Sequence, residues 1–233
     1  MRIIKYTTIF LITIQIVLGI SFPLVAKPEH FWQFPIVIGL EEKIRNVIFH
    51  VPTAWTATIA FTMSLVYGFL YLQKKDFNYE LKSIASAELG FLFCILATVT
   101  GAIWAKFNWG SFWNWDPRQT SIFILLMIYS AYFVLRSSIS EKVKRARISS
   151  VYSILAGVTV PFFIFILPRI TSGLHPGSKG DTEGAGPIVQ FKMAPNMLTL
   201  FFIGLIGFTL LYFWIFNLRY RLLVLENKNE SEE

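Results

Sequence analysis

Six apolar stretches, each about as long as a membrane-spanning helix, constrain this sequence more than any other feature. A helix needs roughly 20 mostly apolar residues to cross the hydrocarbon core of a bilayer, and its backbone polar groups must all be paired there. The stretches cover residues 7–25, 53–72, 84–104, 119–135, 149–168 and 194–216. We therefore predict an all-α integral membrane protein with about six transmembrane helices.

The composition agrees with lipid as the solvent of this chain. Hydrophobic residues make up 55% of the 233 residues and charged residues only 15%, whereas soluble domains are about 25% charged. The first stretch resembles a signal peptide because Arg2 and Lys5 precede it. Its apolar core is longer than a typical signal sequence, and no small-x-small cleavage site stands out before Pro28, so we expect it to remain as a helix.

The basic residues predict the orientation of the helices. One side of the predicted membrane carries thirteen of the 21 basic residues, namely Arg2, Lys5, Lys74, Lys75, Lys82, Arg136, Lys142, Lys144, Arg145, Arg147, Arg219, Arg221 and Lys228. The positive-inside rule makes that side cytoplasmic, and an even number of spans places both termini there. We expect residues 1–220 to form one domain in the cell inner membrane and residues 221–233 a charged cytoplasmic tail. Contact with anionic lipid accounts for the net charge of +7, so no nucleic-acid partner is needed.

The segments on the predicted outer face contain the residue types that bind a flat aromatic ligand or a metal. These segments are residues 26–52, 105–118 and 169–193. They include all three histidines and four of the seven tryptophans, namely His30, His50, His175, Trp32, Trp109, Trp113 and Trp115. The predicted inner loops contain neither residue type.

The second outer segment is the most unusual of the three. Five of its fourteen residues are aromatic, namely Phe107, Trp109, Phe112, Trp113 and Trp115. An aromatic belt at the membrane interface is the simpler explanation, but a belt is spread over the helix ends on both faces. Crowding of the rings into one loop, interrupted by a glycine and an Asp-Pro pair, favours a shaped binding surface.

Asp116 and Arg118 stand where this loop enters the fourth predicted helix. Asp116 suits the N-cap position and Pro117 the first helical position. The Asp116 carboxylate can also accept hydrogen bonds from tryptophan indoles. Arg118 suits either a membrane-headgroup anchor or a partner for an anionic group of a ligand, and the sequence leaves both open.

Two histidines flank the tryptophan-rich segment. His50 stands directly before the second predicted helix, with Pro52 and Thr53 as start signals, and His175 stands in a turn-rich stretch after the fifth. A lone surface histidine is usually a solvated residue, but two at the ends of different helices suggest a shared ligand. Neutral imidazole is a good iron ligand, and haem proteins hold iron by axial side chains. His30 is far from any helix start, and we expect it to be solvated.

The residues from Trp109 to Arg118, Trp-Gly-Ser-Phe-Trp-Asn-Trp-Asp-Pro-Arg, closely resemble the WWD signature of the haem-handling proteins of cytochrome c assembly. The resemblance extends to His-Val-Pro-Thr-Ala-Trp, which begins at His50, and to a histidine in the third outer segment. Length, six spans, inward termini and the position of the signature are similar to the CcmC-type haem exporter family of cytochrome c maturation. The Asp-Pro-Arg-Gln-Thr run at 116–120 also leans toward the CcsA-type synthetases.

This resemblance implies a function that the composition does not reveal. Members of such families present haem on the outer, periplasmic face of the membrane and pass it to a haem chaperone of the CcmE type. The implied site consists of His50 and His175 as axial ligands of the iron of haem b, with Trp109, Trp113, Trp115, Asp116 and Arg118 around the porphyrin. The other implied partners are exporter subunits of the CcmA and CcmB type and a small membrane subunit of the CcmD type.

Other functions remain as alternatives. A CcsA-like haem lyase, an enzyme that joins haem to apocytochrome, resembles this chain at the signature, but such proteins are larger and have further histidines. A b-type cytochrome subunit would place histidines inside helices, and no apolar stretch contains one. A pure scaffold leaves the clustered tryptophans and histidines unexplained.

Several chemistries are excluded or not expected. Without a phosphate-binding glycine loop, we expect no ATPase activity and no enzymatic role for the chain itself. Cys94 is the single cysteine, so neither an intrachain disulfide nor a Cys-x-x-Cys metal site can form.

Overall fold

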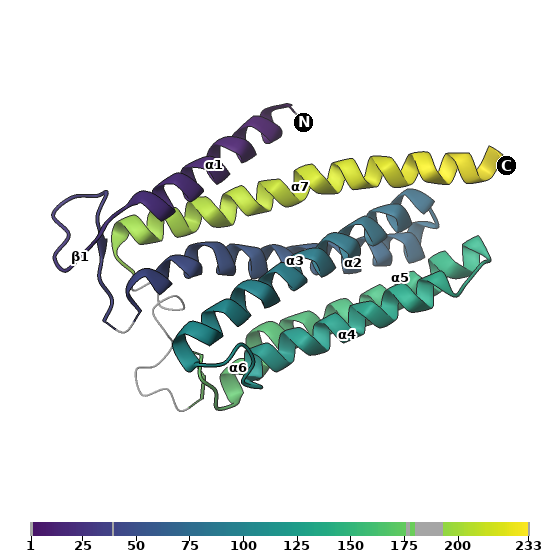
Figure 1. The fold of residues 1–233 in the computed structure, drawn as a ribbon. Coiled ribbons are helices and arrows are strands. Elements are labelled where there is room, and N and C mark those ends of the chain that lie inside the picture. Colours follow the sequence, from purple (N-terminus) through teal and green to yellow (C-terminus); the bar gives the residue numbers. More distant parts are fainter. Residues whose placement is uncertain (1, 39, 176–177, 180–192, 233) are drawn as a thin grey trace.

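The computed structural model describes residues 2–38, 40–175, 178, 179 and 193–232, with side chains up to residue 229. Six of its helices are long and apolar enough to cross a membrane. This confirms the prediction of an all-α, multi-pass membrane protein (Figure 1).

The order of the elements is α1 (Arg2–Ser21), β1 (Leu24–Val25), β2 (Phe34–Pro35), a 3-10 helix (Glu41–Asn46), α2 (Val47–Lys74), α3 (Phe77–Trp109), α4 (Pro117–Ser137), α5 (Lys142–Pro161), a π-helical turn (Phe162–Ile166), α6 (Leu167–Ile170) and α7 (Pro195–Glu232). Short turns connect α2 to α3 and α4 to α5, whereas longer segments precede α2 and α7. The two strands pair in parallel within the connection between α1 and α2.

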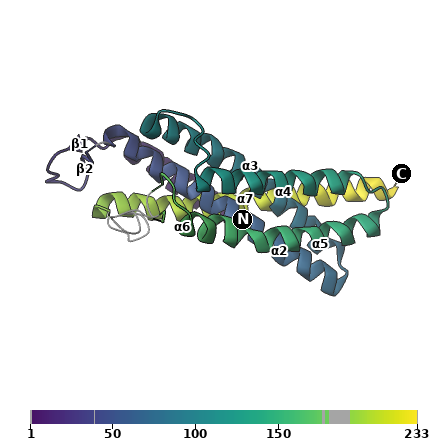
Figure 2. The ribbon, with the colours of Figure 1, turned by 90° about the horizontal axis from the view of Figure 1, so that it is seen from below.

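The long helices lie alongside one another, with α2 and α3 in the middle, α1 against α7 and α4 against α5 (Figures 1 and 2). The α3–α4 connection, α6 and the strands gather at one end, which we call the tryptophan-loop end. The N-terminus of α1 and the C-terminus of α7 point toward the other end, which we call the terminal end. The two ends correspond to the two sides of the predicted membrane.

The helices extend beyond the predicted spans. α3 continues to Trp109, five residues past the expected end at Trp104, and α7 continues through the expected tail to Glu232. With 38 residues and a rise of about 1.5 Å per residue, α7 is roughly 57 Å long, against a hydrocarbon core of about 30 Å. Backbone hydrogen bonding does not stop where the apolar surface stops, so hydropathy locates the span and misses the helix ends.

The start of α2 differs from the prediction and changes the setting of His50. The helix begins at Val47, so His50 lies in its first turn and Pro52 lies inside the helix rather than at its start. Because Pro52 has no N–H, the carbonyl of Ile48 lacks its partner within the helix. The side-chain amide of Gln15, fully buried on α1, donates to that carbonyl. One helix thereby completes the backbone hydrogen bonding of another.

Two ion pairs connect α3 to its neighbours toward the terminal end. Glu80 pairs with Arg136 of α4. Glu88 accepts two hydrogen bonds from Arg219 of α7, at 2.6 and 2.8 Å. An ionised side chain within a spanning helix is costly unless it is paired, so these contacts fix how α4 and α7 are rotated against α3.

Replacement of Gln15 tests the cross-helix bond. Gln15→Leu leaves the Ile48 carbonyl buried and unpaired, so we expect the free energy of unfolding to fall by about 1–2 kcal/mol. The measurement is the midpoint of thermal unfolding of the purified protein in detergent. Thr13→Leu is the matched control because Thr13 is exposed on the same helix. An equal loss of stability in both variants would show that the bond to Ile48 is unimportant.

Candidate functional site

The tryptophan loop, residues 110–116, connects α3 to α4 in a tightly defined path. α3 ends where Gly110 takes a left-handed conformation with φ of 79°. α4 begins at Pro117, and the Asp116 carboxylate accepts a hydrogen bond from the Arg118 amide at 2.9 Å. The predicted N-cap is therefore confirmed. Trp109, expected in the loop, is instead the last residue of α3.

Gln119, buried in the first turn of α4, fixes the path of the loop. Its side chain accepts from the Asn114 amide at 2.8 Å and donates to the Phe112 carbonyl at 3.2 Å. The Thr120 hydroxyl donates to the carbonyl of Trp115 at 3.1 Å. Trp115 has φ of 55°, which is rare for a bulky residue and costs energy. Gln119 was not predicted as a site residue from the sequence, where its only signal is its place in the first turn of a capped helix.

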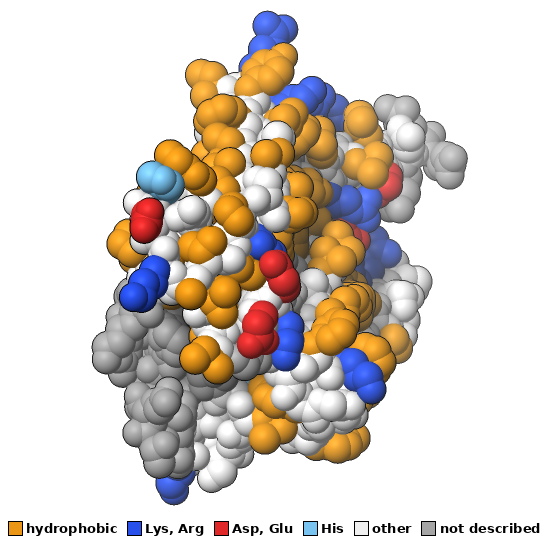
Figure 3. All heavy atoms as spheres, turned by 60° about the vertical axis from the view of Figure 1, so that its left-hand side comes forward, with side chains coloured by type: hydrophobic (Ala, Val, Ile, Leu, Met, Phe, Trp, Pro, Cys, Tyr) orange, Lys and Arg blue, Asp and Glu red, His pale blue; other side chains and the backbone are white. Residues whose placement is uncertain are grey.

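The three signature tryptophans do not form one stack. Trp113, Trp115 and Phe123 meet edge to face, with centroids 5.7–6.4 Å apart. Trp109 packs separately, against the ring of His175 at 4.7 Å. Trp115 is 68% exposed, and the loop end presents many apolar side chains between scattered charges (Figure 3). An aromatic surface is therefore open to a flat ligand.

Asp116 joins the tryptophan loop to the segment after α6. Its Oδ1 lies 2.6 Å from His175 Nδ1, and its Oδ2 accepts from the Leu174 amide at 2.6 Å. Gly173 makes this approach possible, because a Cβ there would lie 2.7 Å from Oδ2. Among the described residues, the partners of Asp116 do not include a tryptophan indole, so the expected indole contact is replaced by the contact with His175.

The buried carboxylate of Asp116 is ionised. Burial alone would raise its pKa, but hydrogen bonds from His175, Arg118 and Leu174 outweigh this effect and lower the pKa to about 2. An ionised carboxylate can only accept, so His175 Nδ1 carries the shared proton. In the neutral ring, Nε2 of His175 then carries the lone pair.

His50 is fixed in the same manner by a different group. Its Nδ1 lies 2.9 Å from the hydroxyl of Thr100 on α3. That hydroxyl already donates to backbone carbonyls of its own helix, at 2.9 and 3.2 Å, so it accepts from His50. The absence of a side chain at Gly101 lets α3 approach the imidazole, since a Cβ there would lie 3.0 Å from Cε1. Nε2 of His50 is again the atom with the lone pair.

The structure brings His50, His175 and Arg118 together. His175 and Arg118 lie close enough to His50 to interact with it electrostatically, although the three residues come from the segment after α6, α4 and α2. Within the described part of the chain, the side-chain hydrogen bond of each histidine is made by Nδ1. The Nε group of Arg118 is buried without a hydrogen-bond partner. Arg169, exposed on α6, lies near enough to Arg118 for the two charges to interact.

His30 does not belong to the group formed by His50, His175 and Arg118. It is exposed in the connection between α1 and α2, where its ring stacks on Trp32 at 4.6 Å. This agrees with the expectation of a solvated loop residue.

Comparison with known proteins assigns the family. The family model for CcmC, heme exporter protein C, matches residues 2–233. The chain belongs to the heme exporter protein C family. It is 30% identical to heme exporter protein C of Haemophilus influenzae, over 95% of this chain and 83% of that one. With the protein of the same name from Rhodobacter capsulatus it shares 27% identity, over 79% and 77%.

Membership of this family makes the chain a multi-pass membrane protein that handles haem in cytochrome c biogenesis. A shorter match, 41% identity over 69 residues, relates the chain to the cytochrome c biogenesis protein CcsA of Manihot esculenta. It covers 30% of this chain and 20% of that protein.

Acid titration tests the contact between Asp116 and His175. A carboxylate with a lowered folded-state pKa stabilises the fold above its unfolded pKa and loses this contribution as the pH falls toward the folded value. We expect Asp116→Asn to lower the unfolding midpoint above about pH 5, where the Asp116 carboxylate of wild type is ionised in both the folded and the unfolded state. The difference from wild type should shrink between the ordinary pKa of 3.8 and the lowered value of about 2.

Asparagine still caps a helix well, so this variant reports chiefly on the histidine contact. Asp76→Asn is the matched control, since Asp76 caps α3 through the Asn78 amide. A difference between Asp116→Asn and wild type that stayed constant down to about pH 2 would contradict the assigned role.

Proposed function

We propose that this protein binds haem b at the tryptophan-loop end through His50 and His175 and transfers it to a haem chaperone of the CcmE type. The supporting observation is that hydrogen bonds orient the two imidazoles in the same way. In each ring the side-chain hydrogen bond is made by Nδ1, and Nε2 is the proposed ligand atom. Metal-binding histidines are commonly oriented in this manner by a hydrogen bond from their second nitrogen.

The residues present fit haem better than a bare metal ion. The described side chains include no group of three or more histidine, cysteine or carboxylate ligands able to enclose an ion. Haem brings four nitrogens of its own and needs only axial protein ligands. Two histidines therefore suffice for this cargo.

Asp116 acts in the proposed site as a positioning residue for His175. A carboxylate bound to Nδ1 fixes the tautomer and makes the other nitrogen a stronger ligand. His50 receives the weaker, neutral hydroxyl of Thr100 at the same position. The two ligands therefore differ in donor strength.

The surroundings suit the remainder of the porphyrin. Trp113 and Trp115 offer aromatic surface, where each ring contact contributes about 0.5–1.5 kcal/mol beyond simple burial. The guanidinium of Arg118, with an unpartnered buried nitrogen, suits the carboxylate of a haem propionate. Arg169 offers a second cation nearby.

The exposed position of the tryptophan loop suits a carrier that must release its cargo. In this proposal the loop end faces the periplasm and the protein lies in the cell inner membrane. ABC-type exporter subunits of the CcmA and CcmB type supply the ATPase activity, and a CcmD-type subunit completes the complex.

A CcsA-like role as a haem lyase component is the second candidate. The local similarity to a CcsA protein favours it, although it covers a small part of that larger protein. A role as a b-type cytochrome is less well supported. His50 does lie within a helix, contrary to expectation, but in its first turn and beside the exposed loop.

Histidine substitutions provide the direct test of the ligands. His50→Ala and His175→Ala should each lose most of the bis-histidine absorption spectrum of the haem-loaded protein, because each removes one iron ligand. The measurement is the oxidised and reduced spectrum of purified protein, with haem quantified per chain. His30→Ala, which removes an exposed histidine, should leave the spectrum unchanged. Equal spectra for all three variants and wild type would refute the assignment.

Haem transfer is a separate prediction. Trp115→Ala removes the most exposed ring of the cluster, so we expect haem binding to weaken by about 1 kcal/mol, or roughly fivefold. Loading of the co-expressed chaperone with haem should decrease in step. Trp32→Ala is the control, because Trp32 is 56% exposed but lies outside the tryptophan loop. Equal chaperone loading by Trp115→Ala and wild type would exclude the loop from transfer.

A further inference from the structure

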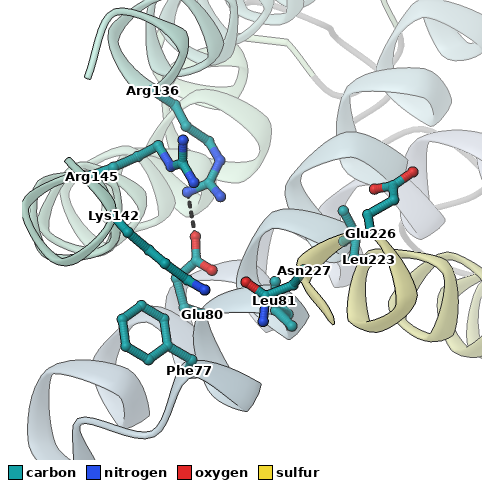
Figure 4. Close-up of a pocket in the computed structure, with 9 residues that line it drawn as sticks. All are labelled: Phe77, Glu80, Leu81, Arg136, Lys142, Arg145, Leu223, Glu226 and Asn227. Carbon is teal, nitrogen blue, oxygen red and sulfur yellow. Dashed lines mark ion pairs between the residues drawn. The ribbon is translucent and has the colours of Figure 1, made fainter. Parts of the chain in front are cut away.

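A charged pocket lies at the terminal end, opposite the tryptophan loop (Figure 4). Its open space is about 80 Å³, enclosed by α3, α4, α5 and α7. The lining residues are Phe77, Glu80, Leu81, Arg136, Lys142, Arg145, Leu223, Glu226 and Asn227. The proposed haem site uses none of them.

Each of the two carboxylates of this pocket is paired with an arginine. Glu80 forms an ion pair with Arg136. Glu226 lies 3.5 Å from Arg219, and Figure 4 shows its carboxylate turned away from Lys142. Among the described side chains, Lys142 and Arg145 form no ion pair, and the ammonium of Lys142 lies 5.4 Å over the ring of Phe77. Three of the lining residues are cationic and two are carboxylates, so the pocket has one positive charge in excess.

The position of Lys142 and Arg145 strengthens the local positive potential. Both lie in the first turn of α5, which begins at Lys142, where the helix dipole is positive and disfavours cations. The backbone amides there are already used, since Glu141 accepts from the amides of Val143 and Lys144. An additional anion would therefore be bound by the Lys142 and Arg145 side chains.

We propose that Lys142 and Arg145 bind the phosphate of an anionic phospholipid. The pocket lies at the ends of membrane-spanning helices, where lipid headgroups gather, and basic pockets between such helices bind headgroups. Its walls are partly apolar, through Phe77, Leu81 and Leu223, which suits the glycerol and first acyl carbons more than a free ion. The space admits a phosphate group and excludes a folded domain.

Exposed apolar side chains occur on the same two helices as the lining cations. Val134 of α4 is 65% exposed and Val143 of α5 is 58% exposed, each one or two residues from a lining cation. α4 and α5 thus offer apolar surface to lipid chains as well as cations to a headgroup. Guanidinium and ammonium groups both make strong charge-assisted hydrogen bonds to phosphate.

Native mass spectrometry of the full-length protein from mixed phosphatidylglycerol and phosphatidylcholine nanodiscs tests the proposal. We expect wild type to retain phosphatidylglycerol preferentially and the double variant Lys142→Gln/Arg145→Gln to lose about tenfold of that preference. Lys144→Gln is the matched control, because Lys144 is an exposed cation of the same turn outside the pocket. Arg136 stays unchanged, so the pair with Glu80 remains.

The outcomes separate the sources of the anion. Preference lost in the double variant and kept in Lys144→Gln supports the site. The proposal is wrong if wild type shows no preference for phosphatidylglycerol, or if both variants lose that preference equally. Diffuse surface charge would then explain any lipid binding. Displacement of the lipid by millimolar inorganic phosphate would overturn the lipid in favour of a soluble anion. Circular dichroism and the unfolding midpoint show whether the double variant is folded.

Discussion

The site depends on one carboxylate, that of Asp116. It caps α4, fixes the imidazole of His175 and accepts the backbone amide of Leu174. Two segments 58 residues apart are thereby joined in a geometry that neither could maintain alone. The short tryptophan loop has no backbone ladder of its own, so its shape follows from this bond and from the bonds of Gln119. Loss of the carboxylate would separate the loop from the histidine that packs against Trp109.

The position of His50 depends on a requirement of membrane proteins, that each backbone polar group in the membrane has a hydrogen-bond partner. Pro52 sits two residues after His50 and deprives the Ile48 carbonyl of its helical partner. Gln15 of α1 replaces that partner, so α2 continues through the proline and places His50 beside Thr100. The first turn of α2 therefore forms because a different helix supplies one polar group inside an apolar interface.

The sequence was sufficient to predict features that are local along the chain. The six spans follow from hydropathy, and the start of α4 follows from Asp116 and Pro117. Helix ends were missed at Trp109 and Val47, because a helix continues while its amides have partners and such partners need not be apolar. The bonds of Gln15, Gln119 and Asp116 to distant groups could not be predicted, since they depend on packing between helices far apart in sequence.

In the proposed haem site, the two imidazoles belong to segments that differ in rigidity. His50 belongs to a long helix packed along α3 and is tied to a neutral hydroxyl. His175 follows a π-helical turn and a single turn of α6, and a buried charge orients it. π-helical turns interrupt regular helices and occur often at functional sites. The two proposed ligands therefore combine opposite features. His50 has the more rigid helical support and the weaker, neutral partner, whereas His175 lies on a shorter segment and has the stronger, charged partner.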